Sequence, residues 1–555
     1  MSNILTPLSL WNNFDDSLEL NSEKISETIY DGVKIERVAF DGRDTFEGRV
    51  RIAACFASCG AAAGNATVLV LPDSDKTIDG ELIYFLAKRG YSVLMVDYRG
   101  EWEGCEHHTV YPENVFYANT ARCGHYKDFV DDSADLTSWY EWVSVGLYAR
   151  KYIVERTGSE DIAVLGIRDG GEIAWKLGVA GKFNCIVPVC AAGWKAYNGV
   201  NKYSQEEPAL DDERYRFIAG IDSQAYAPYI RCPALLLCST NDPAFDYDRA
   251  YDTYTRINPE FLNESSIAYS MQCSAVIGAH SVEDMFLFLD KNLKNRQVFI
   301  PKPAEVFVEM DENCNLVARA VVDEQGVAVT CNIFLAEDCQ NSSLREWSVC
   351  KPKDGSNRTF YLNIYEKTST IFVLCRVRYA NSFSVWSKVV AKKISGKFRN
   401  MQSKCRVLYS DANGVDGFVV ADTRSCAIGG IFLANAELLP RLVNKARGVS
   451  GAYSEYGLTT YRMSNPRYAA SNNSVLSLDL FAESDTKITL AIHDLATGED
   501  YYCIVNVVGG AWQSVVLESK AFKTDGGASL IDYTGEKKFT VDGPVGYAVN
   551  NIVWL

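Results

Sequence analysis

Residues 161–175 constrain the fold of this 555-residue chain more than any other stretch, with the sequence DIAVLGIRDGGEIAW. The apolar run at residues 162–165 is typical of a buried strand, and a helix-forming run follows the glycines. Gly166 and Gly170 permit the tight turn that joins a strand directly to a helix. Such a turn holds the residue at its tip, here Arg168, above the sheet edge and at a helix N-terminus.

The first half of the chain alternates apolar runs with amphipathic segments. We expect leading antiparallel strands at 33–38 and 50–56, strands at 67–71, 91–96, 185–190, 233–239 and 271–277, and helices at 80–89, 139–156, 249–256 and 283–293. Continuous apolar strands separated by helices indicate a buried parallel sheet with helices on both faces. The prediction is therefore a doubly wound α/β domain at residues 33–298, preceded by an N-terminal extension at 1–32.

From residue 301 onward, short strands follow one another without long helices. This spacing predicts an immunoglobulin- or fibronectin-like β-sandwich at residues 301–396. In the remaining chain, apolar residues alternate in two runs, around Leu478 and around Leu490. That alternation predicts a second, jelly-roll-like sandwich at residues 400–555.

Charge and cysteine content limit the partners and the compartment. With 55 basic and 71 acidic residues the formal net charge is −16, which argues against nucleic acid or an anionic membrane as a partner. No apolar run approaches the roughly 18 residues of a membrane span. The N-terminus lacks the basic start of a signal peptide, and the 17 cysteines lie mostly in apolar runs. We therefore expect a cytoplasmic protein.

No cofactor or metal ion is predicted. The sequence has no glycine-rich phosphate loop of the P-loop or dinucleotide-binding type. Two Cys-x-His pairs, starting at Cys105 and Cys123, are candidates for zinc, but the single-residue gap is atypical of zinc sites.

Four motifs together resemble those of a known family. They are GIRDG at residues 166–170, DYRG at 97–100, SWYEW at 138–142 and STND at 239–242. In this combination the chain resembles the α/β-hydrolases over about residues 35–295, and within them the acetylxylan esterase and dienelactone hydrolase-like branch. The turn then corresponds to the family's G-x-S-x-G elbow, and the family order Ser…Asp…His falls on Arg168, Asp242 and His280.

The resemblance implies the fold but not the usual activity. Arg168 occupies the nucleophile position, and an arginine is never deprotonated in a protein, so it does not attack a carbonyl. The segment that normally stabilises the oxyanion is replaced by residues 72–75, including Asp73, whose negative charge would oppose an oxyanion if it points inward. Asp242 and His280 remain as the retained members of the triad.

Three interpretations of Arg168 stay open. It binds an acidic ligand at the helix N-terminus, it forms a salt bridge with Asp242, or it takes part in an unfamiliar mechanism. Asp169, one residue later, is expected to interact with the helix N-terminus. Asp73 and Trp194, the latter from an aromatic cap region, are further candidate binding residues.

Three functional hypotheses follow. The first is a degenerate esterase-like protein that binds an acidic or glycan-derived small molecule, such as a uronic acid. The second is an active ester hydrolase of altered mechanism that uses His280 and Asp242. The third is a non-enzymatic assembly protein, in which the two sandwiches form the interaction surface and homo-oligomers result.

Overall fold

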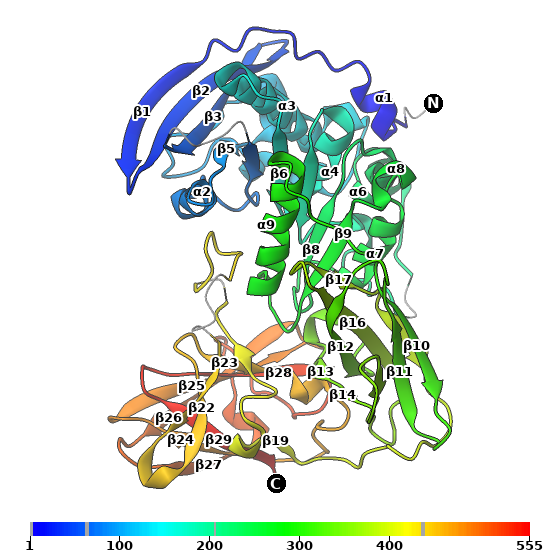
Figure 1. The fold of residues 1–555 in the computed structure, drawn as a ribbon. Helices are drawn as coiled ribbons and strands as arrows, with labels where there is room; N and C mark the ends of the chain where they lie inside the picture. Colours follow the sequence, from blue (N-terminus) through cyan, green and yellow to red (C-terminus); the bar gives the residue numbers. More distant parts are fainter. Residues whose placement is uncertain (1–3, 61–65, 205–206, 424, 434–438) are drawn as a thin grey trace.

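The computed structural model describes residues 4–60, 66–204, 207–423, 425–433 and 439–555 (Figure 1). Its strands fall in three stretches of the chain, at residues 23–270, 305–393 and 407–554. The first stretch forms one sheet with helices on both faces, whereas the other two consist of antiparallel sheets. Among the described residues, no helix is both long and apolar enough to cross a membrane.

The first part is built on a nine-stranded sheet in the order β1-β2-β3-β5-β4-β6-β7-β8-β9. β1 to β3 pair antiparallel and β3 pairs antiparallel with β5, while the strands from β5 to β9 in that order are parallel. The strands are β1 (Glu23–Tyr30), β2 (Val33–Thr45), β3 (Gly48–Cys59), β4 (Thr67–Leu71), β5 (Ser92–Asp97), β6 (Ile162–Ile167), β7 (Cys185–Val189), β8 (Leu235–Ser239) and β9 (Ser266–Ser270). Every residue of β4 to β9 is buried, as expected for a sheet covered on both faces.

Helices cover the two faces of this sheet. α2 (Gly80–Ala87) and α9 (Ala279–Leu293) share one face, where Phe85 and Phe286 meet at 5.4 Å between ring centroids. α3 (Ser138–Thr157) and α4 (Asp169–Ala180) pack together on the other. The other helices are α1 (Pro7–Trp11), α5 (Asp212–Gly220), α6 (Ser223–Tyr226), α7 (Tyr247–Thr255) and α8 (Pro259–Leu262). The predicted α/β arrangement is confirmed.

Two sequence predictions in this part differ from the structure. The last strand is β9, and the apolar run at residues 271–277 is a loop instead of a strand. That run is apolar because it packs on the C-terminal part: Val276 clusters with Ala427 and Leu433, and Ile277 forms a β-bridge with Phe432. The N-terminal residues, expected as a separate extension, contribute β1 to the edge of the sheet.

The second and third parts each contain two antiparallel sheets. The sheets of the second are β10-β11-β15-β14 and β13-β12-β16-β17, with β18 also on β16; those of the third are β21-β22-β29-β24-β27, with β19 on β29, and β20-β23-β28-β25-β26. The second part contains β10 (Glu305–Met310), β11 (Leu316–Val321), β12 (Ala328–Glu337), β13 (Ser348–Val349), β14 (Lys351–Pro352), β15 (Thr359–Tyr361), β16 (Thr370–Tyr379), β17 (Ser384–Trp386) and β18 (Val390–Lys393). The third contains β19 (Val407–Tyr409), β20 (Val419–Val420), β21 (Arg441–Asn444), β22 (Ser450–Tyr453), β23 (Leu458–Thr460), β24 (Leu476–Phe481), β25 (Thr486–Asp494), β26 (Glu499–Val507), β27 (Gln513–Leu517), β28 (Lys537–Asp542) and β29 (Ala548–Trp554). These paired sheets are consistent with β-sandwiches.

Buried polar contacts join the three parts. Arg345 of the second part forms an ion pair with Asp248 of the first at 3.0 Å, with both side chains almost fully buried. Arg462 of the third part pairs with Glu346 of the second at 3.3 Å. Residues 425–433 extend from the third part toward α2 (Figure 1), and the Ile277 amide donates to a carbonyl of this segment at 2.7 Å. Helix α7 and the loop after β9 are therefore held by the β-rich parts.

Candidate functional site

Arg168 lies at the tip of the turn between β6 and α4, with φ of 51° and ψ of −111°. This positive φ is rare for a residue other than glycine, and it turns the chain sharply from the strand into the helix. The neighbouring glycines make the turn possible. A Cβ on Gly166 would lie 2.1 Å from the Gly170 carbonyl oxygen, and one on Gly170 would lie 2.2 Å from the Leu71 carbonyl oxygen.

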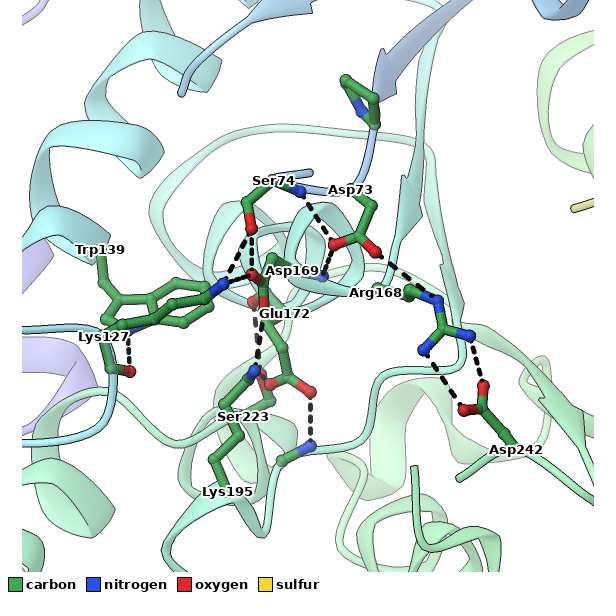
Figure 2. Close-up of polar contacts among 12 residues, drawn as sticks. Asp73, Ser74, Lys127, Trp139, Arg168, Asp169, Glu172, Lys195, Ser223 and Asp242 are labelled. Atoms are coloured by element: carbon green, nitrogen blue, oxygen red, sulfur yellow. Dashed lines mark hydrogen bonds and ion pairs between the residues drawn. The ribbon is translucent and has the colours of Figure 1, made fainter. Parts of the chain in front are cut away.

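The Arg168 guanidinium forms a two-pronged ion pair with Asp242, which follows β8 (Figure 2). The two N–H···O distances are 3.3 and 2.8 Å, and the Asp242 side chain is fully buried. Burial opposes the charge on Arg168, but the Asp242 carboxylate holds the pKa of the guanidinium above its ordinary value. The salt bridge to Asp242, one of the three interpretations of Arg168, is present in the structure.

Asp73 lies on the other side of Arg168, in the loop after β4. Its Oδ1 accepts from the Ser74 amide at 2.8 Å and from the Asp169 amide at 3.4 Å, and its Oδ2 is 3.6 Å from Arg168 Nε. The amide after the nucleophile, with one from an early loop, forms the oxyanion hole of a G-x-S-x-G elbow. In this chain the amides of Ser74 and Asp169 both donate to the carboxylate of Asp73. Burial, followed by repulsion from Asp169 and Asp75, raises the pKa of Asp73 to about 6.

Asp169 begins α4 and is held by two lysines. Lys127 Nζ lies 2.5 Å from one carboxylate oxygen and Lys195 Nζ lies 2.7 Å from the other. The Ser74 hydroxyl donates to Asp169 at 2.5 Å. Burial would raise the pKa of Asp169, but the two lysines hold it below its ordinary value. Asp169 is thus the first residue of α4, and its carboxylate lies in a cluster with Lys127, Lys195 and Ser74.

The lysines of this cluster were not found by sequence reasoning. Lys127 comes from a long insertion that forms 3₁₀ turns. Lys195 lies in another 3₁₀ turn, which follows β7. The insertion contains η1 (Glu113–Ala118), η2 (Thr120–Arg122), η3 (Gly124–Lys127) and η4 (Ala134–Leu136); Lys195 belongs to η5 (Lys195–Tyr197). Neither lysine lies in a motif, so no local signal in the sequence marks them.

A second buried network lies beneath the turn, on α4. One Glu172 oxygen accepts from the Gly193 amide at 3.0 Å, and the other accepts from the Ser223 hydroxyl. Burial lowers the pKa of Lys176 to about 8, and burial together with Glu172 raises the pKa of Asp222 to about 7. Sequence reasoning did not single out these residues.

Two cavities lie beside the turn, of about 850 and 260 Å³. The larger contains residues of all three parts of the chain, with Asp169, Glu172 and Trp194 from the first, Ser343 from the second and Leu495 from the third. The smaller lies toward residues 425–431. Asp73, Asp75 and Arg168 line both cavities.

Trp194, one of the candidate binding residues, forms part of the wall of the larger cavity. Its indole N–H donates to the Thr253 hydroxyl at 2.9 Å, and its ring centroid lies 5.4 Å from that of Tyr197. The guanidinium carbon of Arg249 is 5.5 Å from the Trp194 ring and 4.8 Å from the Tyr197 ring. The orientation of this aromatic pair is therefore fixed by hydrogen bonding and cation–π contact.

The structure does not bring His280 to Arg168 and Asp242. His280 is an exposed residue in the first turn of α9, and its Nδ1 lies 3.4 Å from Arg378 in the second part. Burial and the charges of Arg376 and Arg378 lower the pKa of His280. It lines neither cavity; Ala275 of the preceding loop lines the smaller one. The order of residues along the chain suggested a triad. In the structure β9 ends at Ser270, and the loop at residues 271–278 places His280 beside Arg378 of the second part.

A search for metal sites among the described residues finds no cluster of three or more His, Cys, Asp or Glu side chains able to hold an ion. The Cys-x-His pairs in the insertion are engaged locally where their side chains are described. His107 Nε2 contacts the Ala54 carbonyl at 3.0 Å, and His108 Nδ1 contacts the Cys105 carbonyl at 2.7 Å.

Comparison with known proteins gives distant likenesses only. No protein-family model and no curated protein matches the chain. An acetyl xylan esterase from Paenibacillus sp. R4 is 16% identical over 52% of this chain and 92% of its own, with a TM-score of 0.37. Acetyl Xylan Esterase 1 from Thermoanaerobacterium sp. JW/SL YS485 is 14% identical over 51% of this chain and 93% of its own, with a TM-score of 0.40. A Pyrococcus furiosus esterase is 17% identical over 47% of this chain and 93% of its own, with a TM-score of 0.31.

At these identities and TM-scores, the assignment of the first part rests on its own geometry. A mostly parallel sheet with helices on both faces, a strand–turn–helix elbow after β6 and an acid after β8 define an α/β hydrolase-like fold. The tip of this elbow holds Arg168, which is paired with Asp242.

Proposed function

We propose that this chain is a hydrolase-like protein without serine-esterase activity. The carrying observation is the Arg168–Asp242 ion pair at the tip of the elbow. Acyl transfer by a triad needs a nucleophile, a base within reach and free N–H donors for the oxyanion. Arg168 stands at the position of the nucleophile. His280 contacts Arg378 instead of Asp242, and the amides of Ser74 and Asp169 already donate to Asp73.

We further propose that the larger cavity binds a small glycan-derived ligand. At about 850 Å³ it falls within the roughly 300–1,000 Å³ of ordinary small-molecule sites, and it lies at the carboxyl ends of the parallel strands, where such folds bind ligands. Trp194 and Tyr197 offer apolar ring surface for a sugar, and the carboxylates offer acceptors for its hydroxyl groups.

The charges around the cavity favour a neutral polyol over an acid. Its four basic side chains are all paired with lining carboxylates: Arg168 with Asp242, Lys127 and Lys195 with Asp169, and Arg249 with Asp246. An acidic ligand would have to displace one of these carboxylates, whereas hydroxyl groups can bind without doing so. The exposed Asp75 and Asp128 add further negative charge.

Ligand binding is tested with matched sugars of different charge. Calorimetry would compare xylobiose, glucuronate and glucosamine on the wild type, the Tyr197→Ala variant and the Tyr215→Ala variant. Tyr215 is an exposed tyrosine of α5 that lines neither cavity, so it controls for general loss of an aromatic ring. We expect the neutral sugar to bind and Tyr197→Ala alone to weaken it. Preferential binding of glucuronate would contradict the charge argument.

The β-rich parts support a second candidate function, that of an assembly protein. We propose that residues 301–396 form an immunoglobulin-like sandwich and residues 400–555 a jelly-roll-like sandwich, each from two antiparallel sheets. The exposed β26 side chains Tyr502 and Ile504 offer apolar surface for a homo-oligomer. Light scattering tests this: a strictly monomeric protein at every concentration would remove the assembly role.

We also propose a cytoplasmic location. All 17 cysteines are free thiols, and twelve are buried or lie in strands of the sheets, such as Cys185 and Cys375. Free thiols are typical of a reducing compartment. Thiol counting on protein isolated from its native source would test the location, because a disulfide-bonded form would contradict it.

A further inference from the structure

Asp73 stands between the two cavities. The same three residues, Asp73, Asp75 and Arg168, line both the 850 and the 260 Å³ space. Figure 2 shows the Asp73 carboxylate with the amides of Ser74 and Asp169 on one side and the Arg168 guanidinium on the other. The position and contacts of this side chain are those of a bound anion, although it belongs to the chain.

We propose that the elbow is a carboxylate-binding site, that Asp73 is its resident ligand, and that an external carboxylate competes with Asp73 for it. The donors are the two amides and Arg168, at the start of the twelve-residue helix α4. Amides, guanidinium and helix dipole all favour a carboxylate there. This goes beyond the proposed function, because it adds a second class of ligand at the boundary of the two cavities.

Asp73 is held more loosely than the other carboxylate on Arg168. Asp242 makes two bonds to Arg168, of 2.8 and 3.3 Å, and accepts from the Ala244 amide at 2.9 Å. The Asp73 contacts beyond its own neighbour are longer, at 3.4 Å to the Asp169 amide and 3.6 Å to Arg168 Nε. Asp73 is therefore the carboxylate that exchanges.

The charges that face Asp73 also favour exchange. Asp75 and Asp169 repel it and Arg168 attracts it, while Lys127 and Lys195 are engaged by Asp169. Burial with this repulsion raises the pKa of Asp73 to about 6. Between pH 7.5 and pH 5.5 Asp73 becomes largely neutral, and its hold on the amides weakens while an external strong-acid carboxylate remains ionised.

Trifluoroacetate, followed by fluorine NMR, is a suitable probe because it is a small carboxylate that stays ionised throughout this range. On the full-length wild type we expect tighter binding at pH 5.5 than at pH 7.5. Asp73→Ala should bind about tenfold to a hundredfold more tightly than wild type at pH 7.5, the range for a charge-assisted hydrogen-bonded anion. Its affinity should depend little on pH, because the competing group is gone.

Asp75→Ala is the matched control, because it removes the same charge two residues further along the chain. The Asp75 side chain is exposed and accepts no hydrogen bond from the Ser74 or Asp169 amide. We expect it to change the affinity by less than about fivefold. Asp73→Asn keeps the size of the side chain and should lie between wild type and Asp73→Ala. Equal affinities for Asp73→Ala and Asp75→Ala would overturn the proposal, as would wild-type binding that is no tighter at pH 5.5.

The site itself is tested by adding Arg168→Gln to Asp73→Ala. Binding should fall back to the wild-type level or below if the guanidinium helps to hold the anion. Unchanged binding in the double variant would place the probe elsewhere and overturn the proposal. Neither outcome depends on whether sugars bind in the larger cavity.

Discussion

Replacing Arg168 with glutamine should destabilise the protein by leaving a buried carboxylate without its cation. The Asp242 side chain is fully buried and Arg168 is 14% exposed, so little solvent screens the pair. Removing one partner of a buried ion pair costs about 3–5 kcal/mol. Because Asp242 keeps its bond from the Ala244 amide, the lower end applies. We predict a loss of about 3 kcal/mol in the free energy of unfolding.

The double variant Arg168→Gln/Asp242→Asn separates charge from packing. With neither charge present no carboxylate is left unpaired, so the loss should fall to about 1 kcal/mol, well below the sum of the losses of the single variants Arg168→Gln and Asp242→Asn. Arg296→Gln is the control, because Arg296 is 57% exposed and pairs with Asp290 at 3.3 Å. An exposed pair of this kind should contribute less than about 1 kcal/mol.

Urea unfolding followed by tryptophan fluorescence measures these differences. Trp139, Trp142 and Trp175 are fully buried in the α/β part, so their emission reports on the unfolding of that part. A single Arg168→Gln variant as stable as wild type would refute the reasoning. So would losses that add in the double variant, because additive losses would mean that the two side chains do not interact.

Two further predictions concern the rest of the α/β part. Burial raises the pKa of Asp284 from its ordinary 3.8 to about 8, so native protein keeps a proton that unfolded protein releases, and wild-type stability falls between about pH 4 and pH 8. Asp284→Asn, which can still accept from the Ser384 amide, should gain stability over wild type across that window in urea titrations, and exposed Glu283→Gln should not. Gly170→Ala should abolish soluble folded protein in expression trials, whereas Gly80→Ala, where a Cβ meets nothing within 4 Å, should be tolerated; equal yields would contradict the steric argument.

The sequence predicts the elbow well because local chemistry decides it. An apolar strand, two glycines and a helix-forming run leave one geometry, and the structure places Arg168 at its tip. The salt bridge to Asp242 was also among the interpretations left open, because the resemblance placed Arg168 and Asp242 at two positions of one triad.

Features set by contacts distant in sequence were not predictable. The run at residues 271–277 packs on residues 426–433 and has no place in the sheet, so its apolar character misled the strand prediction. The resulting loop carries His280 away from Asp242. Lys127 and Lys195 reach Asp169 from separate loops, and only the tertiary fold brings them together.

Hydrolysis of a short aryl acetate tests the central claim most directly, with wild type beside Arg168→Gln/Asp242→Asn and His280→Ala. The account predicts equal, background rates for all three, because Arg168 is paired with Asp242 and His280 lies apart from both. A wild-type rate above background that disappears in either variant would contradict it and would restore an active hydrolase of altered mechanism.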